Sequence, residues 1–149
     1  MILLDAALAN ITNLGLDTSP FIYFIERNQT YVAIMREIFR RIDSGVFEGC
    51  SSAITMTEVL VQPKKNQNLV LERQYSDLLM HGRNFTLISI DPQIAGSAAD
   101  LRARYNLRTP DALQVAAALQ AGCEAFLTND KGLQRVTELR VLVLDELKL

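Results

Sequence analysis

A chain of 149 residues, of which 49% are hydrophobic and 21% charged, is long enough for one domain with its own core and too apolar for a disordered protein. The net charge of −2 does not exclude a nucleic acid partner, because acids committed to a metal site would leave the rest of the chain positive. The apolar stretches are too short for a membrane span, and residues 1–5 lack the basic start of a signal peptide, which predicts a cytoplasmic protein with no membrane partner.

The hydrophobic pattern predicts short strands that alternate with helices. Residues 1–12 form a lead-in to which the pattern assigns no role. Strands are expected over residues 11–16, 50–53, 85–90, 125–127 and 141–144. Helices are expected over residues 20–27, 31–44, 69–80, 92–105 and 110–121, with a further helix that starts at Thr55 or Thr57 and is interrupted by Pro63. This alternation predicts one α/β domain over residues 1–149, with a parallel sheet covered by helices on both faces.

The segment Leu14–Pro20 reads as the end of the first strand followed by a helix start. Ser19 suits the N-cap position and Pro20 the first helical position, so the helix can begin without using Asp17. Asp17 is then a free carboxylate at the carboxyl end of a strand, which is where ligands bind in open α/β sheets.

Three further acids stand in comparable places. Glu58 and Asp130 each follow a predicted strand, and Asp111 begins a helix so rich in alanine that it must be buried. Each acid also has a local explanation: a turn for Asp17 and Asp130, a capping box with Thr55 for Glu58, and the helix dipole for Asp111. Carboxylates that converge on one cleft are costly unless a cation joins them, and Mg²⁺ is the usual hard cation for oxygen ligands.

The sequence lacks the residues that other catalytic chemistries require. His81 lies in a polar turn and is expected at the surface, no serine or cysteine has a partnering base, and no phosphate-binding glycine loop or zinc spacing is present. Cys50 and Cys123 are expected to be reduced core residues. Asp91 precedes a proline and is interpreted as a helix N-cap rather than a fifth site acid.

Four short segments together resemble the PIN-domain family, and in particular VapC-like toxin ribonucleases: Leu16-Asp17-Thr18-Ser19, Thr57-Glu58-Val59, Pro110-Asp111-Ala112-Leu113 and Thr128-Asn129-Asp130-Lys131. The resemblance implies a three-layer α/β/α sandwich around a short-stranded central parallel sheet. It also implies Mg²⁺- or Mn²⁺-dependent endoribonuclease activity, with Asp17, Glu58, Asp111 and Asp130 as catalytic metal ligands and Thr18, Thr128 and Asn129 as polar supports. Many relatives are homodimers and toxins of type II toxin-antitoxin systems, inhibited by an antitoxin protein.

The leading hypothesis from the sequence is therefore a metal-dependent ribonuclease. Basic residues near the four acids would hold the RNA backbone, although each could equally be solvated surface: Lys64, Lys65, Arg102, Arg104, Arg108, Lys131 and Arg135. The alternative is a non-catalytic module of the same fold that binds RNA or protein. A magnesium phosphatase is disfavoured, because Asp17 is followed two residues later by Ser19 rather than by a second acid.

Overall fold

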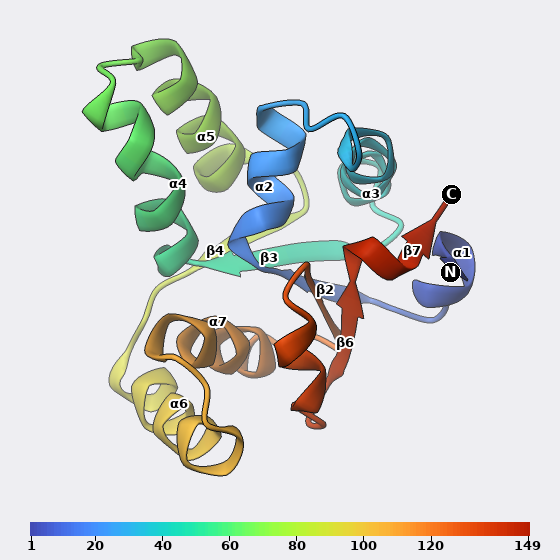
Figure 1. Cartoon of the computed structure of the whole chain (residues 1–149), viewed down its shortest axis with the longest axis vertical. Coiled ribbons are helices and arrows are strands. Elements are labelled where there is room, and N and C mark those ends of the chain that lie inside the picture. Colours follow the sequence, from blue (N-terminus) through green and yellow to red (C-terminus); the bar gives the residue numbers. More distant parts are fainter.

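A five-stranded parallel sheet lies at the centre of the molecule (Figure 1). The computed structural model describes residues 1–149. The strands run in the order β4-β3-β2-β5-β6, so the chain builds the sheet outward from β2, first to one side and then to the other. Their bounds are β2 (Asn13–Leu16), β3 (Glu48–Ser52), β4 (Phe85–Ile88), β5 (Ala125–Thr128) and β6 (Arg140–Val143).

Helices cover both faces of this sheet. One face carries α2 (Thr18–Ile25), α3 (Val32–Asp43), α4 (Ala53–Lys65) and α5 (Leu69–His81), and the other carries α6 (Pro92–Tyr105) and α7 (Thr109–Gln120) (Figure 1). Each face has its own buried apolar cluster, centred on residues such as Phe21 and Ile38 on the first side and Val115 and Phe126 on the second. The predicted three-layer α/β/α fold is confirmed. None of the helices is long and apolar enough to cross a bilayer.

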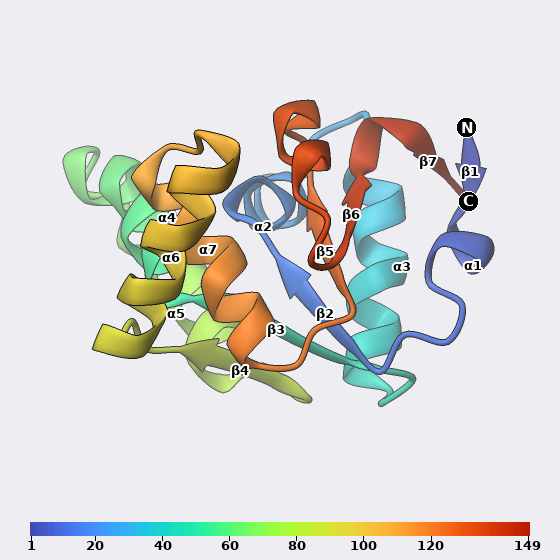
Figure 2. The same ribbon diagram turned by 90° about the horizontal axis from the view of Figure 1, so that it is seen from below.

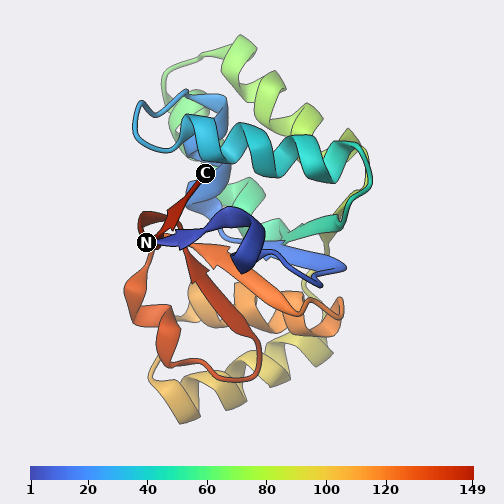
Figure 3. The same cartoon turned by 90° about the vertical axis from the view of Figure 1, so that its right-hand side faces the viewer.

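The lead-in has a structural role that its sequence did not reveal. Strand β1 (Ile2–Leu3) pairs in parallel with β7 (Leu147–Lys148), so both ends of the chain lie side by side (Figures 2 and 3). Between β1 and β2, α1 (Leu4–Ala7) buries its apolar side chains in the first core cluster. Two short 3₁₀ segments, Lys131–Arg135 and Leu144–Glu146, complete the secondary structure.

Two predicted helix boundaries are wrong. Helix α2 begins at Thr18, and Asp17 is its N-cap, because the Asp17 carboxylate accepts a hydrogen bond from the Thr18 amide. Helix α4 begins directly after Ser52, whose hydroxyl accepts from the Ile54 amide, so Glu58 is not part of a capping box. Pro63 does not interrupt α4, which continues to Lys65; the proline lies in the last turn, so the intrahelical hydrogen bond that its missing amide removes is one of the last in the helix.

Other local predictions are confirmed. Asp91 caps α6, since its Oδ1 accepts from the Ile94 amide at 2.8 Å. His81 is exposed. Cys50 and Cys123 are buried and unpaired thiols, although the fold brings their Sγ atoms to 3.1 Å, a proximity that their sequence spacing gave no reason to expect.

Glycine at position 15 lets α7 pack directly on the central strand. A Cβ atom on Gly15 would lie 2.8 Å from Ala118 Cβ and 3.1 Å from Phe126 Cδ1. Neither a helix Cβ nor a buried aromatic ring can rotate out of the way. This close contact fixes the height of α7 above β2, and α7 carries one of the predicted site acids.

Candidate active site

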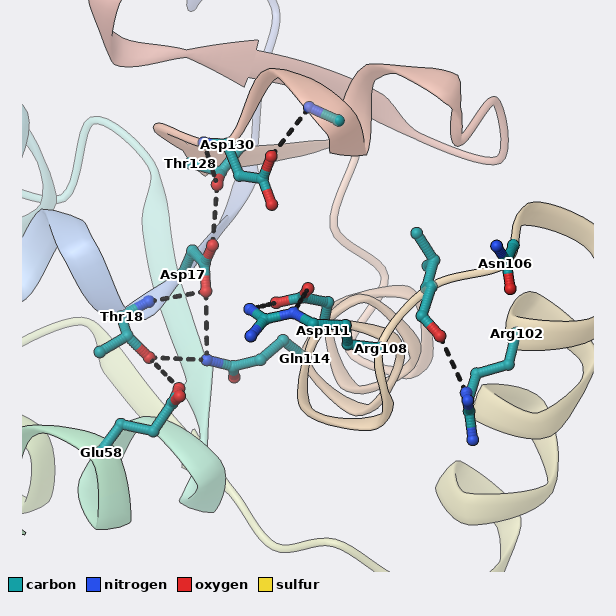
Figure 4. A network of polar contacts seen from close by, with 12 residues as sticks. Asp17, Thr18, Glu58, Arg102, Asn106, Arg108, Asp111, Gln114, Thr128 and Asp130 are labelled. Atoms are coloured by element: carbon teal, nitrogen blue, oxygen red, sulfur yellow. Dashed lines mark hydrogen bonds and ion pairs between the residues drawn. The ribbon is translucent and has the colours of Figure 1, made fainter.

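One polar cleft of about 320 Å³ opens beside the carboxyl ends of the central strands. All four predicted acids line it. Asp17 follows β2, Asp130 follows β5, Asp111 lies in the first turn of α7, and Glu58 projects from α4 (Figure 4). The cleft lies where the strand order reverses, which is the usual place for ligands in this kind of sheet.

Asp17 is the most firmly held of the four acids. Its Oδ1 accepts hydrogen bonds from the Thr18 amide at 2.8 Å and from Gln114 Nε2 at 3.4 Å. Its Oδ2 accepts from Thr128 Oγ1 at 2.7 Å, and its own amide donates to the Leu127 carbonyl. Three hydrogen bonds to the carboxylate therefore fix its rotamer, and the backbone bond fixes the position of the residue.

No basic side chain pairs with Asp17. Withdrawal from water raises the pKa of the Asp17 carboxyl above its ordinary value of 3.8, and the charges of Asp111 and Glu58 raise it further, against the lowering effect of the hydrogen bonds from Thr128 and Thr18. The ionised form is thus electrostatically disfavoured in the protein alone. A cation in the cleft would remove this disadvantage.

Gln114 is a site residue that the sequence reasoning missed. Its buried amide Nε2 lies 2.6 Å from Thr55 Oγ1 and 3.1 Å from Thr18 Oγ1, and its Oε1 accepts from the Ser52 hydroxyl. It therefore ties α7 to the starts of α2 and α4 beneath the acids. The available signal was one amide inside the otherwise apolar run of residues 112–119, one turn after Asp111.

The remaining acids are more exposed and more loosely held. Glu58 Oε1 accepts from Thr18 Oγ1 at 2.6 Å. Asp130 Oδ1 accepts from the Gly132 amide at 2.8 Å, and the Asp130 amide donates to Thr128 Oγ1 at 3.1 Å. Thr18 and Thr128 thus each contact acids of the cleft, as supports of the site would.

Asn129 lines the cleft but contacts none of the four acids. Its Nδ2 donates to the Tyr23 hydroxyl at 3.1 Å, and its Oδ1 accepts from the Asp145 amide at 3.0 Å. The Tyr23 ring is stacked on Tyr31, with ring centroids 4.5 Å apart. In the protein alone, Asn129 therefore anchors the segment after β5 to α2.

The predicted basic rim is largely wrong. Only Arg108 lines the cleft; its Nε lies 3.1 Å from Asp111 Oδ2. The others face different partners, because their helices and loops direct them away from the cleft: Lys64 pairs with Glu72 and Arg104 with Glu138, Lys131 lies near Asp145, and Arg102 and Arg135 donate to backbone carbonyls. Lys65 is exposed and does not line the cleft.

The donor set fits a hydrated cation better than a closed metal cage. The four acids offer only hard oxygen ligands, and the buried Asp17 carboxylate lacks a positive partner. No three His, Cys, Asp or Glu side chains, however, are placed to hold one metal ion together. Mg²⁺ commonly keeps several waters and takes only one or two carboxylates directly, so a pair such as Asp17 and Asp111 suits it.

The raised pKa of Asp17 predicts a characteristic pH dependence of stability. Above pH 3.8 the folded protein retains the Asp17 proton where the unfolded chain has lost it, so the contribution of this group to the unfolding free energy falls as the pH rises. Replacing Asp17 with Asn removes this contribution. We expect the stability of Asp17→Asn relative to the wild type to increase between about pH 4 and about pH 7 in urea titrations without metal. A pH-independent difference would contradict this assignment.

These observations define a class of protein: an α/β/α fold with four carboxylates in one cleft at the point where the strand order reverses. The model of the PIN domain family matches residues 15–139, and the chain belongs to this family. The resemblance predicted from the four acidic segments is therefore confirmed. No curated protein shows significant sequence similarity to the chain.

Solved structures share the fold at low sequence identity. The chain is similar to VapBC2 from Rickettsia felis bound to a promoter DNA fragment, with a TM-score of 0.71 and 14% identity over 89% of this chain and 98% of that one. A toxin-antitoxin complex from Klebsiella pneumoniae has a TM-score of 0.66 and 24% identity, over 89% of this chain and 98% of that one. DNA-bound VapBC from Salmonella typhimurium has a TM-score of 0.67 and 20% identity, over 90% of this chain and 98% of that one. At these identities the likeness establishes the fold.

Proposed function

We propose that this PIN-domain protein is a Mg²⁺- or Mn²⁺-dependent endoribonuclease and the toxin of a type II toxin-antitoxin system. The observation that carries the proposal is the arrangement of Asp17, Glu58, Asp111 and Asp130, which come from four separate elements and line one cleft. A structural role does not explain this cluster, since Asp17 is withdrawn from water without a basic partner and such unpaired charge destabilises a fold. The proposed cation would offset this loss of stability, which a purely structural role leaves unexplained.

In this proposal the chain's own residues hold and orient the reactants. Asp17 and Asp111 would hold the cation, and Glu58 and Asp130, which line the same cleft, would assist them. Thr18, Thr128 and Gln114 keep the carboxylates in place through the hydrogen bonds described above. When bound, the cation supplies a water of lowered pKa and neutralises charge on a phosphodiester.

The proposed partners follow from the family and from the similar structures. Toxin-antitoxin complexes are among the solved proteins of the same fold, and we propose an antitoxin protein as the inhibitor of this chain. We also propose a homodimer in the cytoplasm, as for many relatives. Size-exclusion chromatography with light scattering tests the dimer independently of the nuclease reaction.

Digestion of total RNA by the purified protein tests the proposed activity. We expect fragments in the presence of Mg²⁺ or Mn²⁺ and none after addition of excess EDTA, with activity restored by fresh metal. RNA binding in a gel-shift assay without cleavage under any metal would instead support the non-catalytic binding module. Cleavage that continues in EDTA would contradict the metal-dependent mechanism.

A further inference from the structure

Arg108 is the one basic residue that lines the acidic cleft. Its guanidinium lies along the Asp111 carboxylate, with Nε 3.1 Å from Oδ2 and Nη2 3.5 Å from Oδ1 (Figure 4). Both residues stand at the start of α7, three positions apart. The Arg108 side chain is 76% exposed, whereas that of Asp111 is only 13% exposed.

The charge of Arg108 acts on more than one acid. Its hydrogen bonds to Asp111 are the main cause that raises the pKa of the guanidinium, and the charges of Asp130 and Glu58 add to the effect. Apart from the contact with Asp111, the side chain makes no hydrogen bond in the protein. It is therefore held by a single carboxylate and is free to leave it.

We propose that Arg108 is an internal counter-ion, which occupies Asp111 in the metal-free protein, yields that carboxylate to the divalent cation, and then contacts an RNA phosphate. This inference rests on the proposed nuclease function and adds to it a residue that governs both metal affinity and substrate binding. In the metal-free protein Arg108 pairs with one of the acids that line the cleft. A guanidinium suits both positions, because its planar donors match carboxylate and phosphate oxygens alike.

The expected effect on metal binding is modest and has a definite sign. The arginine of this ion pair is exposed, and exposed ion pairs contribute little free energy. Removal of the Arg108 charge should therefore improve cation affinity by about two- to fivefold. The effect on RNA has the opposite sign, since a lost phosphate contact weakens binding and lowers the salt dependence of binding by about one counter-ion. A residue that merely stabilised the fold would not produce these two opposite changes.

The test is Mn²⁺ titration by calorimetry, without RNA, of the wild type, Arg108→Gln and a matched control. Arg40→Gln is that control, because Arg40 also pairs with an acid three positions away on a helix, Glu37, but does not line the cleft. We expect a lower Kd for Mn²⁺ in Arg108→Gln only. At saturating Mn²⁺ we also expect Arg108→Gln to have a higher KM for RNA, with a weaker salt dependence, than the wild type. Arg108→Lys should give values between those of the wild type and Arg108→Gln.

The possible failures are distinguishable. Equal or weaker Mn²⁺ binding by Arg108→Gln, in a wild type that does bind Mn²⁺, would overturn the counter-ion role and leave the proposed nuclease function standing. An unchanged KM with unchanged salt dependence would overturn the phosphate contact. A wild type that binds no Mn²⁺ at millimolar concentration would overturn the proposed function and this inference with it. Circular dichroism of each variant verifies that the comparison is between folded proteins.

Discussion

Replacing Asp17 with Asn is expected to abolish RNA cleavage while leaving the protein folded. Substitution of residues that merely support a metal ligand costs about 10- to 100-fold, so the loss of a proposed direct ligand should lower the cleavage rate by at least about 100-fold. Asp111→Asn should have a similar effect, because α7 presents this carboxylate to the same cleft.

The fold should tolerate Asp17→Asn because the amide can replace each contact of the carboxylate. Its Oδ1 still accepts from the Thr18 amide and Gln114, and its Nδ2 can donate to Thr128 Oγ1, which now accepts instead of donating. The variant also removes a charge that burial disfavours. We therefore expect an unfolding free energy at pH 7 equal to or higher than that of the wild type.

The matched control for this experiment is Asp91→Asn. Asp91 is also an acid at a helix N-cap, and Asn is an equally good cap, but Asp91 does not line the cleft. Cleavage rates measured with and without EDTA should be unchanged in this control. Full EDTA-sensitive activity in Asp17→Asn would remove Asp17 from the proposed mechanism.

Gly15→Ala is expected to produce a large loss of stability from a small change in side chain. The added Cβ would lie 2.8 Å from Ala118 Cβ, and neither atom can move without shifting β2 or α7. Overpacking of this kind costs about 1–3 kcal/mol. Since α7 carries Asp111 and Gln114, the same shift should reduce cleavage by displacing both from Asp17.

A second substitution tests whether this one contact is the cause. Ala118→Gly removes the opposing Cβ and should cost about 1 kcal/mol alone, as glycine does inside a helix. In the double variant the clash with position 118 is absent and only the 3.1 Å approach to Phe126 Cδ1 remains, so the combined loss should be smaller than the sum of the two single losses. Urea denaturation midpoints of the wild type, the two single variants and the double variant measure this double-mutant cycle.

Gly96→Ala provides the corresponding control. Gly96 lies in α6, and a Cβ there meets nothing within 4 Å. The same substitution should raise stability by up to about 1 kcal/mol through helix propensity. Additive losses at positions 15 and 118 would show that the close approach of α7 to β2 does not limit stability.

The sheet and its helices could be predicted because their signals are local. Helix α6 has the predicted bounds, since Asp91 and Pro92 form an unmistakable helix start. The two-residue strands β1 and β7 were not predicted, because so short a segment has no periodicity to read. The start of α2 was misplaced, because Asp17, Thr18 and Ser19 are all acceptable caps and only the tertiary structure chooses among them.

The candidate site was predictable to the extent that topology determines it. Acids placed after parallel strands must gather at one edge of the sheet, and the four acids do line one cleft; their catalytic and metal-binding roles remain predictions. The directions of long side chains were not predictable. Of the seven basic residues expected around the acids only Arg108 lines the cleft, because an arginine or lysine can reach whichever carboxylate or carbonyl its own helix or loop offers.

The outward growth of the sheet from β2 has a consequence for the newly synthesised protein. Asp17 and Glu58 come from the first half of the chain, and Asp111 and Asp130 from the second. Asp111 is placed by the packing of α7 on β2, β3 and α4, whereas Asp130 joins the other acids only when β5 pairs with β2, through the register of Leu14 with Ala125. A nascent polypeptide that still lacks its last quarter therefore has three of the four acids, but neither Asp130 nor strand β5, and its cleft is incomplete. A chain that cuts RNA would in this way be harmless to the messenger from which it is being translated until its synthesis is nearly complete.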